Sequence, residues 1–309
     1  MESARRDLFD KIVKVYPNLS PKKKRVADFI IKDHKRIFMM TAKEIAQECQ
    51  VSEPTIIRFT VDLGFSGYME FVQYMKGLLH IELTAVERLL KTSRQPDQLT
   101  TIERYCRNAI SNLESMMNTV SEKDFKRIAK AVFKAETVYV VGYRASAALA
   151  YYFGYLLKKI RNKVVIDTTL TWELRDLIAQ NGKSGLMFVV AFPRYPRKTI
   201  ELMEYAKEHQ VKVIGMSDTP KSPIVSRSDQ YVIIDLEAVS FVDPFAHVMA
   251  YLSALVHEVT YLDLTSSTKC LSRFDNGVRV GDEFFTEDGA GPEDSETANS
   301  YLTSFCPPS

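Results

Sequence analysis

The sequence predicts an all-helical N-terminal domain followed by a three-layer α/β domain with a five-stranded parallel sheet. Three observations predict this division. Apolar residues recur at helical spacing from the start of the chain to about residue 133. The period then changes, and five short β-branched runs follow. Helix-length stretches separate the first four runs, and this alternation is typical of parallel strands joined by right-handed crossovers.

The composition is that of a soluble globular protein with room for two hydrophobic cores. The 309 residues are 46% hydrophobic and 26% charged. Because no apolar run is long enough for a membrane span and the first residues show no signal-peptide pattern, we expect a cytoplasmic protein with no membrane contact. The cysteines have no metal-ligand spacing, so we expect neither a metal nor another cofactor. They are Cys49, Cys106, Cys270 and Cys306.

Five helical patterns at the N-terminus predict a compact bundle. They cover residues 3–15, 21–34, 41–49, 52–63 and 67–80. The last pattern continues to Leu90, so we expect the first domain to span residues 1–91. Its predicted core consists of Leu8, Ile12, Val26, Phe29, Ile30, Ile45, Ile56, Phe59 and Phe71.

Residues 45–65, IAQECQVSEPTIIRFTVDLGF, predict two short helices joined by a tight turn. Ser52 suits the N-cap of the second helix, Pro54 is tolerated in its first turn, and Gly64 suits the position just beyond its end. The side chains that this helix should bury are Val51, Ile56, Phe59 and Leu63. An ordinary Ser-capped bundle helix is one interpretation; a recognition helix in the DNA major groove is the other. The exposed residues that such a recognition helix would present are Ser52, Glu53, Thr55, Ile57 and Arg58.

The stretch VSEPTIIRFTVDLGFSGYMEF, with TAKEIAQECQ before it, is similar to the helix-turn-helix of RpiR-type bacterial transcription regulators. The usual form in that family is roughly V-S-x-A/P-T-[IV]-x-R-[FL]-x-x-x-L-G-[FY]-x-G-[FY]-x-E-[FL]. The resemblance covers residues 8–79 and departs at Thr60, Val61 and Asp62, where basic residues are frequent. It implies a regulator that binds operator DNA.

Positive charge is concentrated at the helical end of the chain. Residues 1–80 contain 14 Lys and Arg against 10 Asp and Glu, whereas residues 265–309 contain 3 against 8. Ser20 is the expected cap of a helix that opens with four cations. Cations at a helix start oppose the helix dipole, so DNA phosphates explain them better than helix stabilisation does; a solvated face is the alternative. The predicted phosphate contacts are Lys22, Lys23, Lys24, Arg25 and Lys43.

A polar stretch with a proline, TSRQPDQLT, predicts a domain boundary. We assign residues 92–120 to this linker and a connecting helix, and residues 121–264 to the α/β domain. Ser121 and Asp124 form a cap-like pair at the first helix of that domain. Its predicted strands cover residues 137–142, 163–167, 185–192, 211–217 and 230–235. The connecting helix covers residues 101–117, and the later helices cover residues 145–160, 170–178, 196–209 and 239–262.

Two stretches of this second half resemble the SIS domain, a phosphosugar-binding module that follows the helix-turn-helix in RpiR-type regulators. The first is TVYVVGYRASAALAYYFGYLLKKIRNKV. The second is KVIGMSDTPKSPIVSRSDQYVII, with Ser222, Pro223 and Asp229 in their customary places. The resemblance covers residues 121–262. It implies a sensor for a small anionic metabolite such as a sugar phosphate.

We expect the ligand site where the strand order of a 2-1-3-4-5 sheet reverses, outside the carboxyl ends of the first and third strands. The exit loops there are GYRAS at residues 142–146 and FPRYPRKT at residues 192–199. They depart from the SIS patterns G-x-G-x-S and S-x-S-G-x-T, so arginines would replace the backbone and hydroxyl cradle. These arginines could instead lie on the surface or in a subunit interface. The predicted ligand-binding residues are Gly142, Tyr143, Arg144, Ser146, Arg194, Arg197, Lys198 and Thr199, with Trp172, Glu173 and Ser240 added by position.

We therefore predict a transcription regulator and not an enzyme. The alternative is a SIS-type sugar-phosphate isomerase, which needs a base beside the substrate carbon. The candidate bases Glu173, Glu237, His247 and His257 lie in no recognisable catalytic motif. A purely structural module would leave the helix-turn-helix resemblance unexplained. The expected partners are operator DNA with an inverted repeat, the anionic metabolite, and further copies of this chain in a homodimer or homotetramer.

The last predicted helix is apolar around most of its circumference, which predicts a subunit interface, with packing on the sheet as the alternative. Residues 265–309 are acidic and poor in periodic apolar residues, so we expect them to be largely disordered. Within them, Asp275, Asn276 and Gly277 are compatible with a small hairpin turn.

Overall fold

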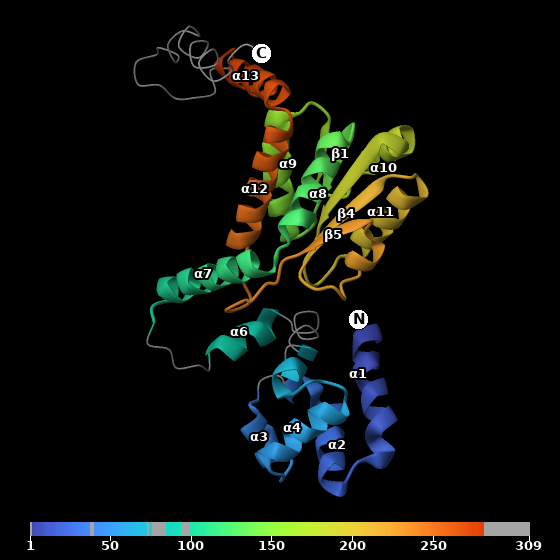
Figure 1. Ribbon diagram of the computed structural model, residues 1–309, viewed down its shortest axis with the longest axis vertical. Helices are drawn as coiled ribbons and strands as arrows, with labels where there is room; N and C mark the ends of the chain where they lie inside the picture. Colours follow the sequence, from blue (N-terminus) through green and yellow to red (C-terminus); the bar gives the residue numbers. More distant parts are fainter. Residues whose placement is uncertain (1, 38–39, 73, 76–84, 94–98, 281–309) are drawn as a thin grey trace.

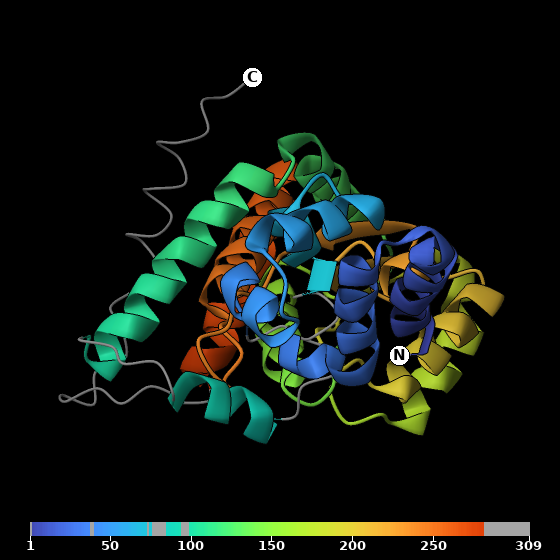
Figure 2. The same ribbon diagram turned by 90° about the horizontal axis from the view of Figure 1, so that it is seen from below.

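The structure is a computed structural model that describes residues 2–37, 40–72, 74–75, 85–93 and 99–280. A helical domain precedes an α/β domain, as the sequence predicts (Figure 1). Seen from below, the helices of the first domain lie in front of the second (Figure 2). The carboxyl edge of the sheet faces the helical domain, because Lys221, in the loop after the fourth strand, holds its Nζ 4.0 Å from the ring centroid of Tyr74.

Four helices and a 3₁₀ turn form most of the helical domain. They are α1 (Glu2–Val15), η1 (Tyr16–Asn18), α2 (Pro21–Ile37), α3 (Ala42–Glu48) and α4 (Glu53–Asp62). A further helical stretch covers residues 68–72 and 74–75. The predicted core residues cluster inside this domain, although Phe29 is only partly buried. The predicted continuation of the fifth helix toward Leu90 crosses residues 76–84, which lie outside the described residues.

Local capping explains where the two short helices begin and end. Thr41 Oγ1 accepts the Glu44 N–H at 3.2 Å, and Glu44 Oε2 accepts the Thr41 N–H at 2.6 Å. The hydrogen bonds that the Thr41 N–H and hydroxyl donate to Glu44 Oε2 hold the pKa of this carboxyl below its usual range. Gln50, in the turn before α4, has a φ of +50°, and Gly64 just after α4 has a φ of +90°. The glycine therefore supplies the left-handed position that ends α4.

Three helices connect the helical domain to the sheet. They are α6 (Ala85–Ser93), α7 (Thr101–Thr119) and α8 (Glu122–Lys134). Thr100 and Glu103 form a capping box at α7, and the Ser121 hydroxyl accepts the Asp124 N–H at 3.3 Å at α8, as predicted. Asn112 of α7 is buried and accepts the backbone N–H of Glu237 at 3.1 Å, so α7 is anchored to the α/β domain.

Five parallel strands form the sheet in the predicted order β2-β1-β3-β4-β5. The strands are β1 (Thr137–Val141), β2 (Val164–Asp167), β3 (Gly185–Val190), β4 (Lys212–Ser217) and β5 (Gln230–Ile233). The intervening helices are α9 (Ser146–Ile160), α10 (Trp172–Asn181) and α11 (Arg197–Glu208), with η2 (Gly182–Ser184) and η3 (Val225–Arg227). The β1 register pairs Val141 with Asp167 of β2 and with Val189 of β3. The switch point between β1 and β3 therefore lies where the sequence predicts it.

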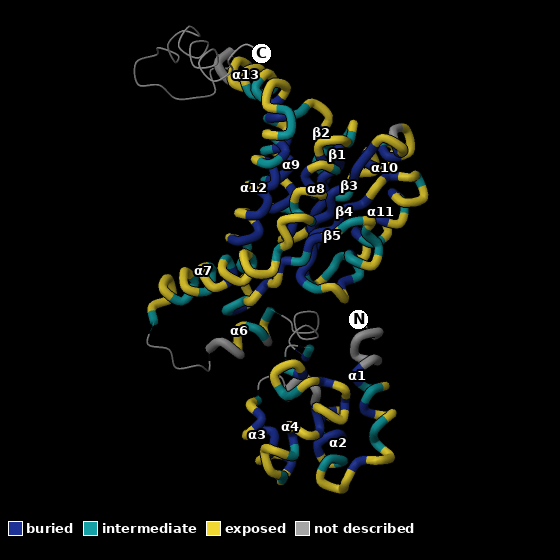
Figure 3. Tube along the Cα trace, viewed as in Figure 1, coloured by how far each residue is buried: buried dark blue, intermediate teal, exposed yellow. Residues whose placement is uncertain are grey.

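Side chains alternate across the sheet and form two separate apolar layers. On one face, Val138 and Val140 pack with α8, α9 and α12 (Ala246–Leu262). On the other face, Tyr139 and Val141 pack with α10 and α11. The strands and the inner faces of α9 and α12 are buried (Figure 3). This is the predicted three-layer architecture.

The last predicted helix starts later than expected. Residues 239–245 are not helical, and α12 begins at Ala246. Pro244 explains the difference, since a proline disfavours helical backbone in the residue before it. Much of the apolar circumference of α12 is covered within the chain, because this helix contacts α7, α8, α9 and α13 (Leu264–Val280), but Met249 and Tyr261 remain exposed. Among the described residues, no helix is long and apolar enough to cross a bilayer.

The expected disorder is wrong for residues 265–280, which form α13. Phe274 packs edge-on against Tyr155 of α9 with ring centroids 6.1 Å apart, and Arg273 donates to Asn162 Oδ1. Asp275 lies inside this helix, so the residues 275–277 form no hairpin turn. The apolar residues of α13 are sparse, and the exposed rings of α9 supply their partners. The expectation for residues 281–309 falls outside the described residues.

Candidate functional site

The outer face of α4 presents the predicted DNA-reading residues. On its inner face, Ile56 and Phe59 are buried in the helical core. On its outer face, four side chains are exposed and Thr55 is half-buried. The exposed ones are Ser52, Glu53, Ile57 and Arg58. The geometry is that of a helix whose free side could enter a major groove.

Ser52 occupies the N-cap position of α4, but its side chain makes no capping hydrogen bond to the backbone. Its Oγ lies 2.9 Å from Thr55 Oγ1 instead. Pro54 lies in the first turn, as predicted. The N–H groups at the start of α4 are therefore not occupied by Ser52, and such groups favour a phosphate oxygen.

Three of the four cations at the start of α2 have partners inside the domain. Lys23 Nζ pairs with Asp62, the last residue of α4. Lys24 Nζ lies 5.4 Å from the ring centroid of Tyr16, and Arg25 donates from Nη2 to the Gln50 carbonyl oxygen at 2.9 Å. Lys22, by contrast, is exposed with no partner among the described residues, and Lys43 on α3 is exposed. The α2 cations therefore fasten the helix-turn-helix as well as adding positive charge.

The Lys23–Asp62 pair also explains one departure from the usual motif. A carboxylate at the end of a helix opposes the helix dipole. Lys23 neutralises that carboxylate, and the two side chains are only 22% and 33% exposed. The acidic residue at position 62 is thus balanced by a lysine of α2.

A cavity of about 400 Å³ lies at the predicted switch point. It collects four of the predicted ligand residues, which are Tyr143, Arg144, Ser146 and Arg194. Four further residues of the predicted exit loops also line it: Ala145, Phe192, Pro193 and Pro196. Residues outside those loops complete its wall: Ala85, Arg88, Phe241, Asp243 and Phe245. The cavity thus combines guanidinium groups with aromatic rings, and its size suits a small metabolite.

The other predicted ligand residues do not line this cavity. They are Gly142, Trp172, Glu173, Arg197, Lys198, Thr199 and Ser240. The Arg197 side chain is 92% exposed, with its Nε 3.3 Å from Glu201 Oε1 on the outer surface of α11. Trp172 is 70% exposed on α10. Thr199 is buried, and its hydroxyl has no hydrogen-bond partner in the described part of the chain. Position along a loop is a weak guide here, because successive residues at a helix start point in different directions.

Arg144 adopts a left-handed backbone conformation with a φ of +58°. It stands where the SIS pattern G-x-G-x-S has its second glycine. The backbone thus keeps a conformation that favours glycine, at a cost of roughly 1–2 kcal/mol for a residue with a Cβ. Such strain is typical of positions where a side chain has a function.

Gly142, by comparison, cannot carry a side chain. A Cβ there would lie 2.6 Å from the Ser146 carbonyl oxygen and 2.8 Å from Ala150 Cβ. The glycine lets the start of α9 approach the end of β1. It therefore shapes the loop without facing the cavity.

Two tyrosines fix the two exit loops. The Tyr143 hydroxyl donates to Asp167 Oδ2 at 3.1 Å, and the Tyr195 hydroxyl donates to Asp218. Burial and the neighbouring carboxylates raise the pKa of both phenols, which remain protonated donors. Tyr143 therefore lines the cavity with its hydroxyl already bonded to Asp167.

Arg88 and Asp243 join α6 to the loop that precedes α12. Arg88 Nη1 lies 2.8 Å from Asp243 Oδ1, and the two side chains are 15% and 18% exposed. Phe192 and Phe245 pack beside this pair with ring centroids 5.8 Å apart. No local sequence signal could have linked Arg88 to Asp243, because only the docking of α6 brings them together.

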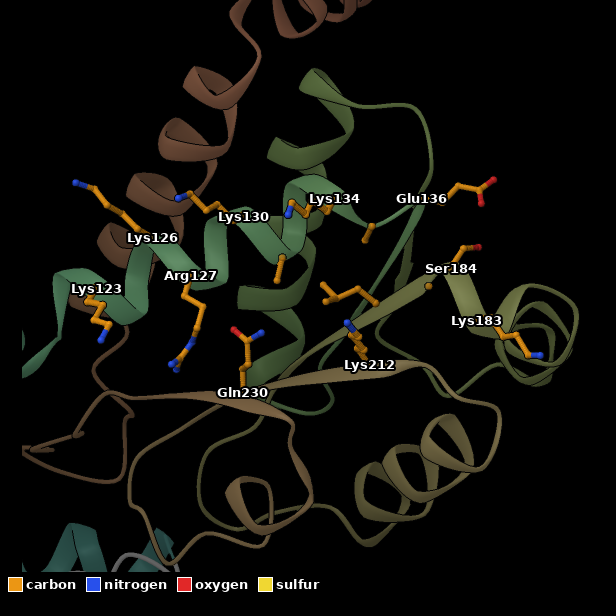
Figure 4. A pocket seen from close by; sticks show the side chains of 14 residues that line it. Lys123, Lys126, Arg127, Lys130, Lys134, Glu136, Lys183, Ser184, Lys212 and Gln230 are labelled. Atoms are coloured by element: carbon orange, nitrogen blue, oxygen red, sulfur yellow. The ribbon is translucent and has the colours of Figure 1, made fainter.

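A second, basic groove of about 850 Å³ lies at the opposite, amino-terminal edge of the sheet. Five cations of α8 line up along the helix, and Lys212 and Gln230 face them from the starts of β4 and β5 (Figure 4). The cations that line this groove are Lys123, Lys126, Arg127, Lys130, Lys134, Lys183 and Lys212. Lys126 and Arg127 pair with acids one turn back on α8, at 3.0 Å and 2.9 Å. Lys130 and Lys134 suit the carboxyl end of this helix.

The candidate bases of an isomerase are scattered. His247 is buried and donates from Nε2 to the Asp235 carbonyl oxygen at 2.9 Å. His257 and Glu173 are exposed. The backbone of Glu237 forms two hydrogen bonds with the Asn112 amide: its N–H donates to Oδ1, and its carbonyl oxygen accepts from Nδ2. None of the four lines the switch-point cavity. In the described part of the chain, no group of three or more His, Cys, Asp or Glu could hold a metal ion.

Burial raises the pKa of the Cys49 thiol to about 11, so it stays protonated.

Comparison with known families gives two separate matches. Residues 7–80 match the helix-turn-helix domain of the rpiR family, and residues 131–258 match the SIS domain. An uncharacterised HTH-type transcriptional regulator of Haemophilus influenzae is 24% identical over 74% of this chain and 80% of its own length. This chain belongs to the RpiR-type transcriptional regulators. HexR of Pseudomonas aeruginosa, an HTH-type transcriptional regulator, is 23% identical to it over 69% of this chain and 73% of its own.

Solved structures show the same fold. The sugar isomerase domain of an RpiR transcription factor from Sphaerobacter thermophilus superposes with a TM-score of 0.55 at 22% identity, covering 58% of this regulator and 99% of that chain. The NanR protein of Vibrio vulnificus, complexed with ManNAc-6P, superposes with a TM-score of 0.54 at 20% identity and covers 88% and 97%. The second match extends over both domains of the regulator.

Proposed function

We propose that the regulator reads operator DNA with the exposed half of α4. Arg58, Thr55 and the neighbouring exposed residues would contact base edges, while Lys22 and Lys43 would contact phosphates. The observation that supports this is the outward face of α4, which leaves these side chains available. Because regulators of this kind act as symmetric oligomers, the operator is an inverted repeat with half-sites about one helical turn, or a multiple, apart.

Substitutions on α4 test this proposal. Arg58→Ala and Thr55→Ala should weaken binding to the operator more than binding to a scrambled duplex, because base contacts carry the sequence preference. Lys14→Ala removes a cation from an exposed position on α1 and serves as the matched control. If the parent protein binds operator and scrambled duplex equally well at moderate salt, the proposal is wrong.

We further propose that the switch-point cavity binds a small anionic metabolite of the sugar-phosphate class. The observation that supports this most is the convergence of Arg88, Arg144 and Arg194 on one cavity, with the Ser146 hydroxyl beside them. Guanidinium groups form paired, charge-assisted hydrogen bonds to phosphates and carboxylates. The structurally similar NanR is complexed with a sugar phosphate. None of the candidate bases lines the cavity, which favours a sensor over an isomerase.

The test compares two cavity arginines with one outside it. Arg144→Ala and Arg194→Ala should leave operator affinity without effector nearly unchanged and abolish the response to effector, because a ligand acts only through its different affinities for two states. Arg197→Ala is the matched control, since its side chain is exposed outside the cavity. Operator binding is measured with a panel of sugar phosphates at millimolar concentration. An unchanged response in both cavity variants would contradict the assignment.

A further inference from the structure

Arg88 of α6, one of the helices that connect the helical domain to the sheet, lines the proposed ligand cavity. It belongs to α6, which precedes the linker, and its guanidinium lies in the cavity with the exit loops of β1 and β3. Through its 2.8 Å contact with Asp243 it holds α6 against the loop before α12. Both side chains are more than four-fifths buried. An ion pair with this little solvent interacts more strongly than one on the surface.

The charges around the cavity are unbalanced. Three guanidinium groups line it, those of Arg88, Arg144 and Arg194. Among the described residues that line it, Asp243 is the only carboxylate. A bound anion would lower the repulsion among the cations and would face the same guanidinium that Asp243 contacts. Asp243 and a bound anion would thus compete for the Arg88 guanidinium.

We propose that an acidic ligand in this cavity replaces Asp243 as the partner of Arg88, and that this exchange is how the ligand acts on α6 and hence on the DNA-binding domain. The inference rests on the proposed anion site and names the residue that couples it to the rest of the protein. The ligand class is a phosphate monoester or a carboxylate, because either offers two oxygens to a guanidinium. Arg144 and Arg194 hold the anion in the α/β domain, whereas the contact with Arg88 connects the anion to α6.

A rescue experiment separates this role from ordinary packing. Asp243→Asn should loosen α6, so amide hydrogen exchange within Ala85–Ser93 should become faster by about tenfold if the ion pair stabilises the helix by about 1.4 kcal/mol. Inorganic phosphate at millimolar concentration should restore the protection, because phosphate takes the place of the carboxylate beside Arg88. Chloride at the same ionic strength should not. In Arg88→Gln, which keeps an apolar stem without the charge, exchange should be fast and phosphate should have no effect.

A double-mutant cycle on phosphate affinity distinguishes competition from general electrostatics. Asp243→Asn should strengthen phosphate binding about tenfold with Arg88 present and less than about twofold in the Arg88→Gln background. An equal gain in both backgrounds would mean that Asp243 acts only through its charge, and would overturn the exchange. In another outcome, phosphate binds, and Arg144→Ala abolishes that binding, without any return of amide protection to α6 in Asp243→Asn. That result would contradict the coupling through Arg88 but leave the anion site intact. If neither the parent nor Asp243→Asn binds phosphate, the anion site itself fails.

Discussion

Arg25 of α2 donates a hydrogen bond at 2.9 Å to the carbonyl oxygen of Gln50, which has a φ of +50° in the turn of the helix-turn-helix. One side chain thus holds the turn that sets the angle between α3 and α4. Nearby, the Lys23–Asp62 pair holds the other end of α4 against α2. The basic start of α2 therefore positions α4 at both ends.

This relationship predicts that Arg25 affects stability and DNA binding together. Arg25→Met should lower the free energy of unfolding by about 1 kcal/mol, since it removes a hydrogen bond from a charged donor at a partly solvated site. Lys22→Met should leave stability unchanged, because Lys22 has no partner among the described residues. Urea unfolding of the two variants measures the difference. Equal stabilities would show that the Arg25–Gln50 bond does not hold the turn.

Lys22 instead should matter for DNA alone. Lys22→Gln should reduce affinity for every duplex and lower the salt dependence by about one unit of slope, because it removes one cation that would bind a phosphate. The control is Lys130→Gln combined with Lys212→Gln in the basic groove, which lies at the sheet edge away from the helical domain. Titrations over a range of salt concentrations should show no change in slope for the control. If the control changed the salt slope as much as Lys22→Gln does, the basic groove would itself bind DNA phosphates.

Backbone strain at Arg144 predicts an unusual response to glycine. Arg144→Gly should be more stable than Arg144→Ala by about 1 kcal/mol, because alanine keeps the Cβ that a φ of +58° disfavours. Neighbouring Ala145 has a φ of −60°, so Ala145→Gly should instead destabilise by roughly 0.5–1 kcal/mol. Urea unfolding tests both. If Arg144→Gly is the less stable of the two Arg144 variants, the loop is not strained.

Burial of His247 predicts a loss of stability in mild acid. Burial lowers the pKa of this imidazole. Its Nδ1, which a second proton would occupy, has no hydrogen-bond partner among the described residues. The unfolded chain therefore binds the proton more readily, so stability is full above the ordinary histidine pKa of about 6.5 and falls as the pH drops below it, by at most about 1.4 kcal/mol per pH unit. His247→Phe should flatten this slope, whereas His257→Gln, at an exposed position of the same helix, should not. Unfolding curves between neutral and mildly acidic pH give the slopes.

The assembly state is a further prediction. We expect a homodimer or homotetramer with the exposed side of α12 in the interface, where Met249 and Tyr261 are 38% and 62% exposed. Met249→Lys with Tyr261→Lys should lower the mass in solution to that of a smaller species. Met69→Lys, at an exposed apolar position of the helical domain, should not. A strictly monomeric mass for the parent protein at micromolar concentration would rule this interface out.

Local sequence patterns determined the division into a helical and an α/β domain and the position of α4 with its exposed residues. Each of these depends on short-range periodicity or on a motif such as the run from Val51 to Phe65. The position of the switch point also follows from strand order alone. The partners of α2, by contrast, depend on which residues of α4 lie opposite, and Lys23 meets Asp62 only after the bundle has packed.

Tertiary structure decided the membership of the cavity and the fate of the C-terminal segment. Arg88 and Asp243 are separated by more than 150 residues, and no local pattern shows that α6 docks at the carboxyl edge of the sheet. Likewise, α13 has too few apolar residues to predict a helix, and Tyr155 of α9 supplies the packing partner that Phe274 lacks in its own sequence neighbourhood. Periodicity reports which residues of one element share a face. It does not report which other element covers that face, because that choice depends on the free energy of the whole packed structure.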